Sequence, residues 1–135
     1  MGRRLILDTG VIIALERGRL AASDFLQPAD EVGFSVVTLA ELKAGLALAT
    51  HQHRPRMERF LDALLTVVQV LPYDATVLEH HARLLAWTRR NGVPRGSADL
   101  IVAATAAATG RVLLSADERA RFSDLPGVEA QLLTA

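Results

Sequence analysis

The chain of 135 residues contains no cysteine, which excludes disulfide scaffolds, thiol nucleophiles and cysteine-ligated zinc or iron–sulfur sites. Aromatic residues make up only 4% of the chain, which argues against modules that stack RNA bases on aromatic platforms. Lys43 is the single lysine, so chemistry that needs a reactive amine has one candidate. These absences remove several classes of enzyme and binding module.

An excess of charge of either sign is also absent, because fifteen basic residues balance fifteen acidic ones. This balance excludes a generally basic nucleic-acid coat or an acidic tail, but it allows a local basic patch. No apolar run approaches the roughly 18 residues that span a bilayer. Asp8 interrupts the apolar run over residues 5–15, and no small-residue cleavage site follows it. We therefore expect a cytoplasmic protein that does not enter a membrane.

Half of the residues are hydrophobic, so a chain of this length can bury a core without disulfides or a structural metal. The sequence has no linker rich in glycine and serine, no low-complexity block and no internal repeat. Domains typically run to about 100–150 residues. We therefore predict a single domain over residues 1–135.

Apolar strands alternate with helices along the chain. Strands are predicted at residues 4–7, 32–37, 67–71, 111–114 and 128–133. Helices are predicted at residues 11–17, 20–26, 38–49, 55–66, 74–90 and 97–109. Because the strands are apolar throughout and separated by helices, the fold class is α/β, with a central parallel sheet of about five strands covered on both faces.

Four carboxylates are expected near the carboxyl edge of such a sheet, where ligands bind. Asp8 ends the first strand, Asp117 follows the fourth, and Glu41 lies in the first turn of the helix after the second. Asp99 lies in the first turn of the helix at 97–109. Since ligands of open α/β sheets bind beyond the carboxyl ends of the strands, we expect these side chains to meet in one crevice.

Each of these acids also has a structural interpretation. Glu41 fits a capping box that begins at Thr38. The negative charge of Asp99 is stabilised by the dipole at the start of its helix. Asp8 and Asp117 are candidate caps of the helices that follow them. The alternative to an enzyme is therefore a non-catalytic α/β binding or signalling module whose acidic residues are helix caps.

Electrostatics favours a functional role for the four acids taken together. Two carboxylates about 4 Å apart repel by roughly 4 kcal/mol at an effective dielectric constant near 20. A crevice of several acids therefore needs a cation or forces protonation. Carboxylate oxygens suit Mg²⁺ or Mn²⁺, and such ions activate water and stabilise a leaving oxygen. This pattern predicts hydrolytic phosphoryl transfer.

The order and spacing of the motifs resemble the PIN-domain ribonucleases, and within them the VapC toxins of bacterial toxin–antitoxin pairs. The resemblance covers nearly the whole chain. The matching motifs lie at residues 7–13, 38–45, 99–106 and 113–117, followed by Phe122 and residues 125–128.

The resemblance implies a PIN-like three-layer α/β/α fold and endonucleolytic cleavage of RNA that depends on Mg²⁺, with Mn²⁺ as a substitute. It also implies a homodimer and a small cognate antitoxin that blocks the acidic crevice. The family's four catalytic and metal-binding acids fall on Asp8, Glu41, Asp99 and Asp117. Ser115 matches a hydroxyl of the family's site. Thr9 is adjacent to the site, next to Asp8, and is a supporting residue.

Arg119 and Arg121 are the candidate RNA-binding residues. A neutral protein that cuts RNA needs local positive charge to hold the phosphate backbone. Both arginines closely follow Asp117 in the sequence.

Overall fold

The computed structural model describes residues 2–134, in which helices and strands alternate as expected. The strands are β1 (Arg4–Leu7), β2 (Glu31–Ser35), β3 (Gln69–Leu71), β4 (Val112–Ser115) and β5 (Ala130–Leu132). The α-helices are α1 (Thr9–Glu16), α2 (Val36–Leu48), α3 (Arg54–Val67), α4 (Ala75–Asn91) and α5 (Ser97–Thr109). Short 3₁₀ turns occupy η1 (Ala22–Asp24), η2 (Glu118–Ala120) and η3 (Phe122–Asp124). None of these helices is long and apolar enough to cross a bilayer.

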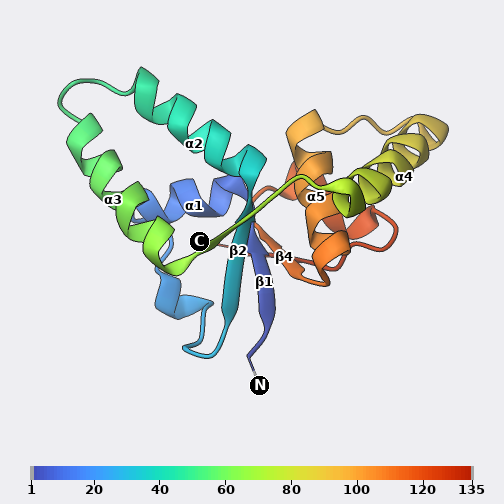
Figure 1. The fold of residues 1–135 in the computed structure, drawn as a ribbon, viewed down its shortest axis with the longest axis horizontal. Coiled ribbons are helices and arrows are strands. Elements are labelled where there is room, and N and C mark those ends of the chain that lie inside the picture. Colours follow the sequence, from blue (N-terminus) through green and yellow to red (C-terminus); the bar gives the residue numbers. More distant parts are fainter. Residues whose placement is uncertain (1, 135) are drawn as a thin grey trace.

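All strand pairs of the sheet are parallel, and the strand order is β3-β2-β1-β4-β5. The first strand is therefore central, with Ile6 opposite Gly33 of β2 on one side and Leu113 of β4 on the other. In Figure 1 the α2–α3 pair and the α4–α5 pair lie on opposite sides of these strands. The predicted parallel α/β sheet is confirmed.

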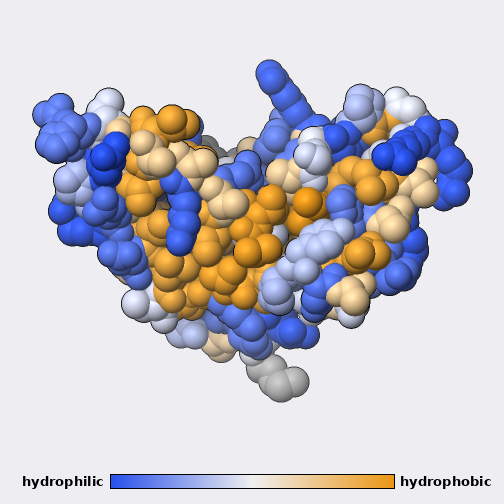
Figure 2. All heavy atoms as spheres, turned by 45° about the horizontal axis from the view of Figure 1, so that its top comes forward, coloured by the Kyte–Doolittle hydropathy of each residue, from blue (hydrophilic) through white to orange (hydrophobic). Residues whose placement is uncertain are grey.

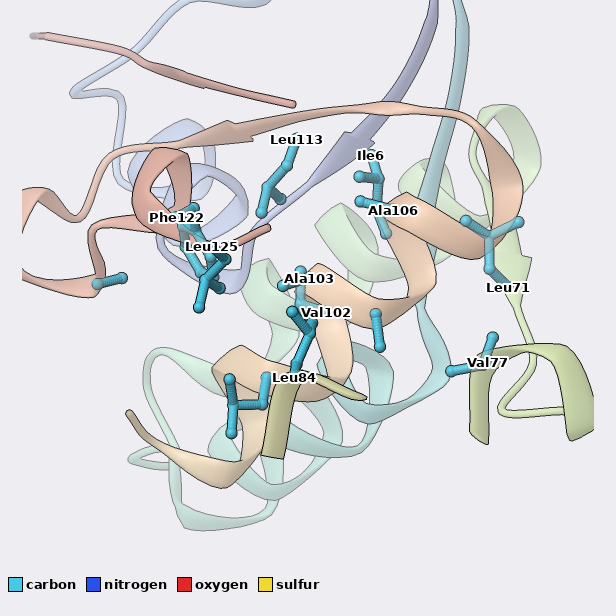
Figure 3. Close-up of a cluster of buried hydrophobic side chains, with 13 residues drawn as sticks. Ile6, Leu71, Val77, Leu84, Val102, Ala103, Ala106, Leu113, Phe122 and Leu125 are labelled. Atoms are coloured by element: carbon cyan, nitrogen blue, oxygen red, sulfur yellow. The ribbon is translucent and has the colours of Figure 1, made fainter. Parts of the chain in front are cut away.

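Side chains along the central strand alternate between two cores, as the pleat of a strand requires. Ile6 packs with α4, α5 and Leu113 in the cluster that Figure 3 shows. Leu5 and Leu7 face the other way and pack with α1 and Phe34. Because both faces of the sheet bury apolar side chains, the molecule has three layers, α/β/α.

The helix predicted at 97–109 forms with the same bounds as α5. It presents small side chains to the core, and Ala103, Ala104 and Ala106 are completely buried. Gly110 ends the helix in the left-handed conformation, with φ 63°, which glycine adopts without steric cost. The close packing of this helix on the sheet follows from its small residues.

The prediction of a helix over residues 20–26 is wrong, since only the η1 turn forms there. The side chains of Arg3 and of the nearby Asp30 bind the backbone of this segment and of the residue after it. The Arg3 guanidinium donates to the carbonyl of Phe25 at 2.8 Å, and the Asp30 carboxylate accepts from the amide of Gln27 at 2.8 Å. These bonds stabilise an irregular loop.

The boundary predicted between the second strand and its helix is also wrong. We expected the strand to run to residue 37, but β2 ends at Ser35, whose hydroxyl accepts from the amide of Val37 at 3.1 Å. This N-cap starts α2 at Val36 despite its β-branched residues. Glu41 consequently lies in the second turn of the helix, and the capping box predicted from Thr38 does not form.

Arg111 is a buried arginine at the amino ends of the strands. Its guanidinium donates to the carbonyls of Leu5 and Glu31 and to the side chain of Gln69, each at 3.3 Å. The Glu31 carboxylate lies 3.7 Å away, and burial lowers the pKa of Arg111. One side chain therefore ties together the beginnings of β1, β2 and β3.

We expect Arg111→Met to lower the free energy of unfolding by about 1–3 kcal/mol, because methionine fills the stem but leaves buried acceptors without a donor. Urea unfolding followed by circular dichroism measures this change. The matched control is Arg4→Met, since Arg4 is half exposed and its ion pair with Glu31 is 4.0 Å long. A variant as stable as the parent would contradict a bridging role for Arg111.

Candidate active site

Asp8 lies at the carboxyl end of the central strand. The residues that follow the neighbouring parallel strands lie at the same edge of the sheet. It is only 6% exposed, and its amide donates to the carbonyl of Leu114 on β4 at 3.0 Å. Its carboxylate accepts from the amide of Thr9 at 2.8 Å and so caps α1. The capping role proposed for Asp8 is thus present, but the carboxylate also has neighbours that a cap does not need.

Ser115 connects Asp8 with Asp117. Its hydroxyl donates to the Asp8 carboxylate at 3.2 Å and accepts from the amide of Asp117 at 3.0 Å. The exposed Asp117 carboxylate caps η2 by accepting from the amide of Arg119 at 2.9 Å. The last residue of β4 therefore fixes the relative positions of two acids that are far apart in sequence.

Thr9 brings Glu41 to the same edge. The Thr9 hydroxyl donates to Glu41 Oε1 at 2.9 Å and lies 3.2 Å from the hydroxyl of Thr38, which is fully buried. Sequence analysis interpreted Thr38 as a cap and so missed its place beneath the site. Only a structure that packs α1 against α2 reveals this contact.

Asp99 enters the site from the first turn of α5. It is half-buried, and its Oδ2 lies 3.2 Å from the position that a Cβ on Gly96 would take. The nearby Arg95 donates to the carbonyls of Val93 and Arg121 at 3.3 and 3.4 Å, so its guanidinium is fixed near the carboxylate. Glycine at position 96 leaves room for Asp99 to turn back over the start of its helix.

The carboxylates are close enough to change one another's ionisation. Burial and, to a lesser extent, the charges of Asp99 and Asp117 raise the pKa of Asp8 to about 6. Hydrogen bonds from Thr9 and Ser115 act in the opposite direction. Burial also raises the pKa of Asp99, as do Asp117 and Glu41, while Arg95 lowers it. All four predicted acids therefore lie in one neighbourhood, close enough for their charges to interact.

The donor set of this neighbourhood suits a hard divalent cation, because it consists of carboxylate oxygens that repel one another. Within residues 2–134, however, no three acidic or histidine side chains are already gathered around a common ion position. The acids fit a divalent cation by charge and chemistry, and Asp8, Asp99, Asp117 and Glu41 are the residues that could hold it.

Arg119 and Arg121 are both exposed beside Asp117. Arg121 adopts a left-handed backbone conformation, with φ 45°, and its guanidinium lies 3.9 Å from the Asp124 carboxylate. Arg95 was not placed in the site by sequence analysis, but its charge lowers the pKa of Asp99. In the sequence Arg95 directly follows Pro94 in a loop, and no motif there links it to the acids.

The raised pKa of Asp8 makes the stability of the metal-free protein depend on pH. Between about pH 4 and pH 6 the folded state binds a proton that the unfolded state has released, so stability falls as pH rises. A shift of about two pKa units corresponds to roughly 2–3 kcal/mol. Asp8→Asn keeps the shape of the side chain but not its charge. We therefore expect the free energy of unfolding of this variant, relative to that of the parent, to increase by about this amount between pH 4 and pH 7.

Urea unfolding of both proteins in a metal chelator, at several pH values across this interval, tests the expectation. A stability difference between parent and variant that is the same at every pH would show that Asp8 is not destabilised by ionisation.

The comparison with known families identifies the domain. The PIN domain family model matches residues 5–128. Ribonuclease VapC5 of Mycobacterium tuberculosis is 36% identical over 114 residues, which cover 84% of this chain and 82% of that relative.

Solved structures agree with this assignment. VapBC-5 of Mycobacterium tuberculosis, a member of the VapBC family of toxin–antitoxin systems, superposes with a TM-score of 0.78 and 28% identity, covering 96% of this chain and 98% of that one. VapBC2 of Rickettsia felis, bound to a promoter DNA fragment, reaches a TM-score of 0.85 at 18% identity, with 96% and 98% coverage, and supports the fold alone. From the matched domain and the relative that is more than a third identical, we conclude that this chain belongs to the PIN-domain family and, within it, to the VapC ribonucleases.

Proposed function

We propose that the protein is a divalent-metal-dependent endoribonuclease and the toxin of a toxin–antitoxin pair. The observation that carries the proposal is the meeting of four carboxylates from four separate segments at the carboxyl edge of the sheet. A protein that only needed helix caps would not bury Asp8 among acids that make its ionisation unfavourable. The VapC relatives supply the substrate class, RNA.

Each acid has a role that follows from its surroundings. Asp8, Asp99 and Asp117 would hold Mg²⁺, or Mn²⁺ in its place, because they form the mutually repelling group. When bound, the ion supplies Lewis-acid chemistry and neutralises charge on the phosphodiester. Glu41 would help to hold the ion, and its exposed carboxylate would also orient the attacking water and accept its proton.

The hydroxyls act as positioning groups. Thr9 donates to Glu41, which fixes one carboxylate oxygen and leaves the other for water. Ser115 holds Asp8 and the backbone of Asp117 in one arrangement. The site thus uses hydrogen bonds from the sheet edge to orient acids that would otherwise move apart.

We expect Asp99→Asn to reduce RNA cleavage by about a hundredfold or more, because it removes one charge from the group that attracts the cation. The assay follows cleavage of total cellular RNA by the purified protein with Mg²⁺ or Mn²⁺. A metal chelator should abolish the activity of the parent, and renewed addition of the ion should restore it.

Asp62→Asn is the matched control, since Asp62 is exposed on α3 and takes no part in the site. Undiminished cleavage by a folded Asp99→Asn variant, or cleavage that survives the chelator, would contradict the proposed mechanism.

The proposed antitoxin has a surface beside the site to bind. A hollow of about 260 Å³ lies between α1, α2 and α3, and its wall includes Glu41 together with apolar side chains such as Ile12, Leu46 and Phe60. The VapBC-5 structure is described as a member of a toxin–antitoxin family. An apolar segment of the cognate antitoxin in this hollow would cover the acidic crevice from its Glu41 side.

We expect Leu46→Glu to weaken the complex with the proposed cognate antitoxin, because it puts a charge into the apolar hollow. Leu48→Glu is the control, since Leu48 is 86% exposed and lies two residues further along α2. Co-purification after joint expression measures both. Equal recovery of the partner by Leu46→Glu and by the parent would contradict this docking surface.

The remaining part of the proposal is a homodimer. Figure 2 shows a broad hydrophobic face between the α2–α3 pair and the α4–α5 pair. Exposed apolar side chains lie along the segment from the end of α3 to the start of α4, at Leu65, Val67, Tyr73 and Leu78. Faces of this kind commonly mark protein interfaces, and the molar mass in solution tests the assignment.

A further inference from the structure

Beyond Asp117, the molecular surface is hollowed on the side away from Glu41. One hollow of about 290 Å³ is lined by Asp117, Ala116 and Gly10 at the site, and by Arg19, Leu20 and Leu133 further out. It thus begins at a proposed catalytic acid and ends at a cation. This combination suits a phosphate group next to the one that is cleaved.

The chain holds Arg19 in place through its backbone. Gly18 takes a left-handed conformation, with φ 73°, and turns the chain back after α1. The amides of Arg19 and Leu20 then donate to the carbonyl of Ala14 at 2.8 and 3.2 Å. Leu20 packs into the core beneath. The turn is therefore fixed, while the Arg19 side chain remains exposed.

The guanidinium of Arg19 is available for a ligand. Among the described residues it makes no side-chain hydrogen bond and has no carboxylate within 4.0 Å, whereas three other arginines near this surface are held by acceptors. Arg121 lies near Asp124, and Arg95 is bound to two backbone carbonyls. Arg3 is paired with Asp30 at 2.6 Å. Arg19 is thus the cation in this hollow whose charge the protein does not itself use.

The hollow continues past Arg19 along the β5 edge of the sheet. A second hollow of about 510 Å³ shares Arg19, Leu20 and Leu133 with the first. It adds the charged residues Arg3 and Asp24 and polar groups such as Ser23, Gln27 and Gln131. Together the two form a trough that leads from the acids to a polar surface. A single strand needs such a path on at least one side of the bond that is cut, because an acidic crevice alone repels it.

We propose that Arg19 binds a backbone phosphate of the RNA next to the scissile one, and that the strand leaves the site through this trough. The inference rests on the proposed function. Arginine suits the role because its planar guanidinium donates two hydrogen bonds to one phosphate. In this arrangement Arg19 selects no base, and it holds the strand in register with Asp117.

Binding of a short, fluorescein-labelled RNA of mixed sequence, measured by anisotropy in a chelator so that no cleavage occurs, tests the proposal. We expect Arg19→Ala to weaken binding about five- to tenfold. The slope of log affinity against log salt should also become shallower by about 0.7 to 1. Arg19→Lys should keep most of the salt slope and recover part of the affinity.

Arg83→Ala is the matched control, because Arg83 is an exposed arginine on α4 that lines neither hollow. It should leave both quantities unchanged. The variants should unfold at the temperature of the parent, since the exposed Arg19 side chain makes no hydrogen bond or ion pair among the described residues. Cleavage by Arg19→Ala with Mn²⁺ present should show a raised KM and a kcat close to that of the parent.

Two negative results are distinguishable. If the parent binds and cuts RNA but Arg19→Ala behaves like the parent, or like Arg83→Ala, then the Arg19 contact is wrong and the proposed function stands. If the parent binds no RNA, both fall together. An Arg19-dependent affinity in a protein that cuts no RNA would support the contact and contradict the proposed catalytic activity.

Discussion

Repulsion among carboxylates is the constraint to which the rest of this structure responds. A parallel sheet sends the ends of all its strands to one edge, so residues such as Asp8 and Asp117 meet there even though more than a hundred positions separate them in sequence. Asp8 is buried directly after the central strand, where water screens it little. The fold must therefore hold together a group of charges that favours separation.

The stabilising contributions come from both sides of that edge. Thr9 and Ser115 donate hydrogen bonds to the acids, and Arg95 is fixed by backbone carbonyls near Asp99. Behind the edge, two apolar cores pack against opposite faces of the sheet. The site therefore lies at the edge of a sheet whose two faces are both covered by apolar cores.

Sequence reasoning succeeded where local signals and global packing agree. The bounds of α5 follow from an alanine-rich stretch that ends at Gly110, and both features are visible in the sequence. It failed where side-chain hydrogen bonds to the backbone, or contacts between helices, decide the structure. The loop after α1 depends on Arg3 and Asp30, and the start of α2 depends on the Ser35 cap, which a pair of valines conceals. The contact between Thr9 and Thr38 likewise exists only once two helices have packed together.

Arg111 gives the molecule a polarity that its formal charge of zero does not reveal. This cation is buried at the amino ends of the strands, while the acids cluster at the carboxyl ends of the same central strands. Charges of opposite sign therefore lie at the two ends of these strands, although the Glu31 carboxylate, 3.7 Å from Arg111, offsets part of the positive charge. A polyanion that approaches the acidic end meets repulsion. Rates of encounter with such a partner depend on orientation and ionic strength even though the particle as a whole is neutral.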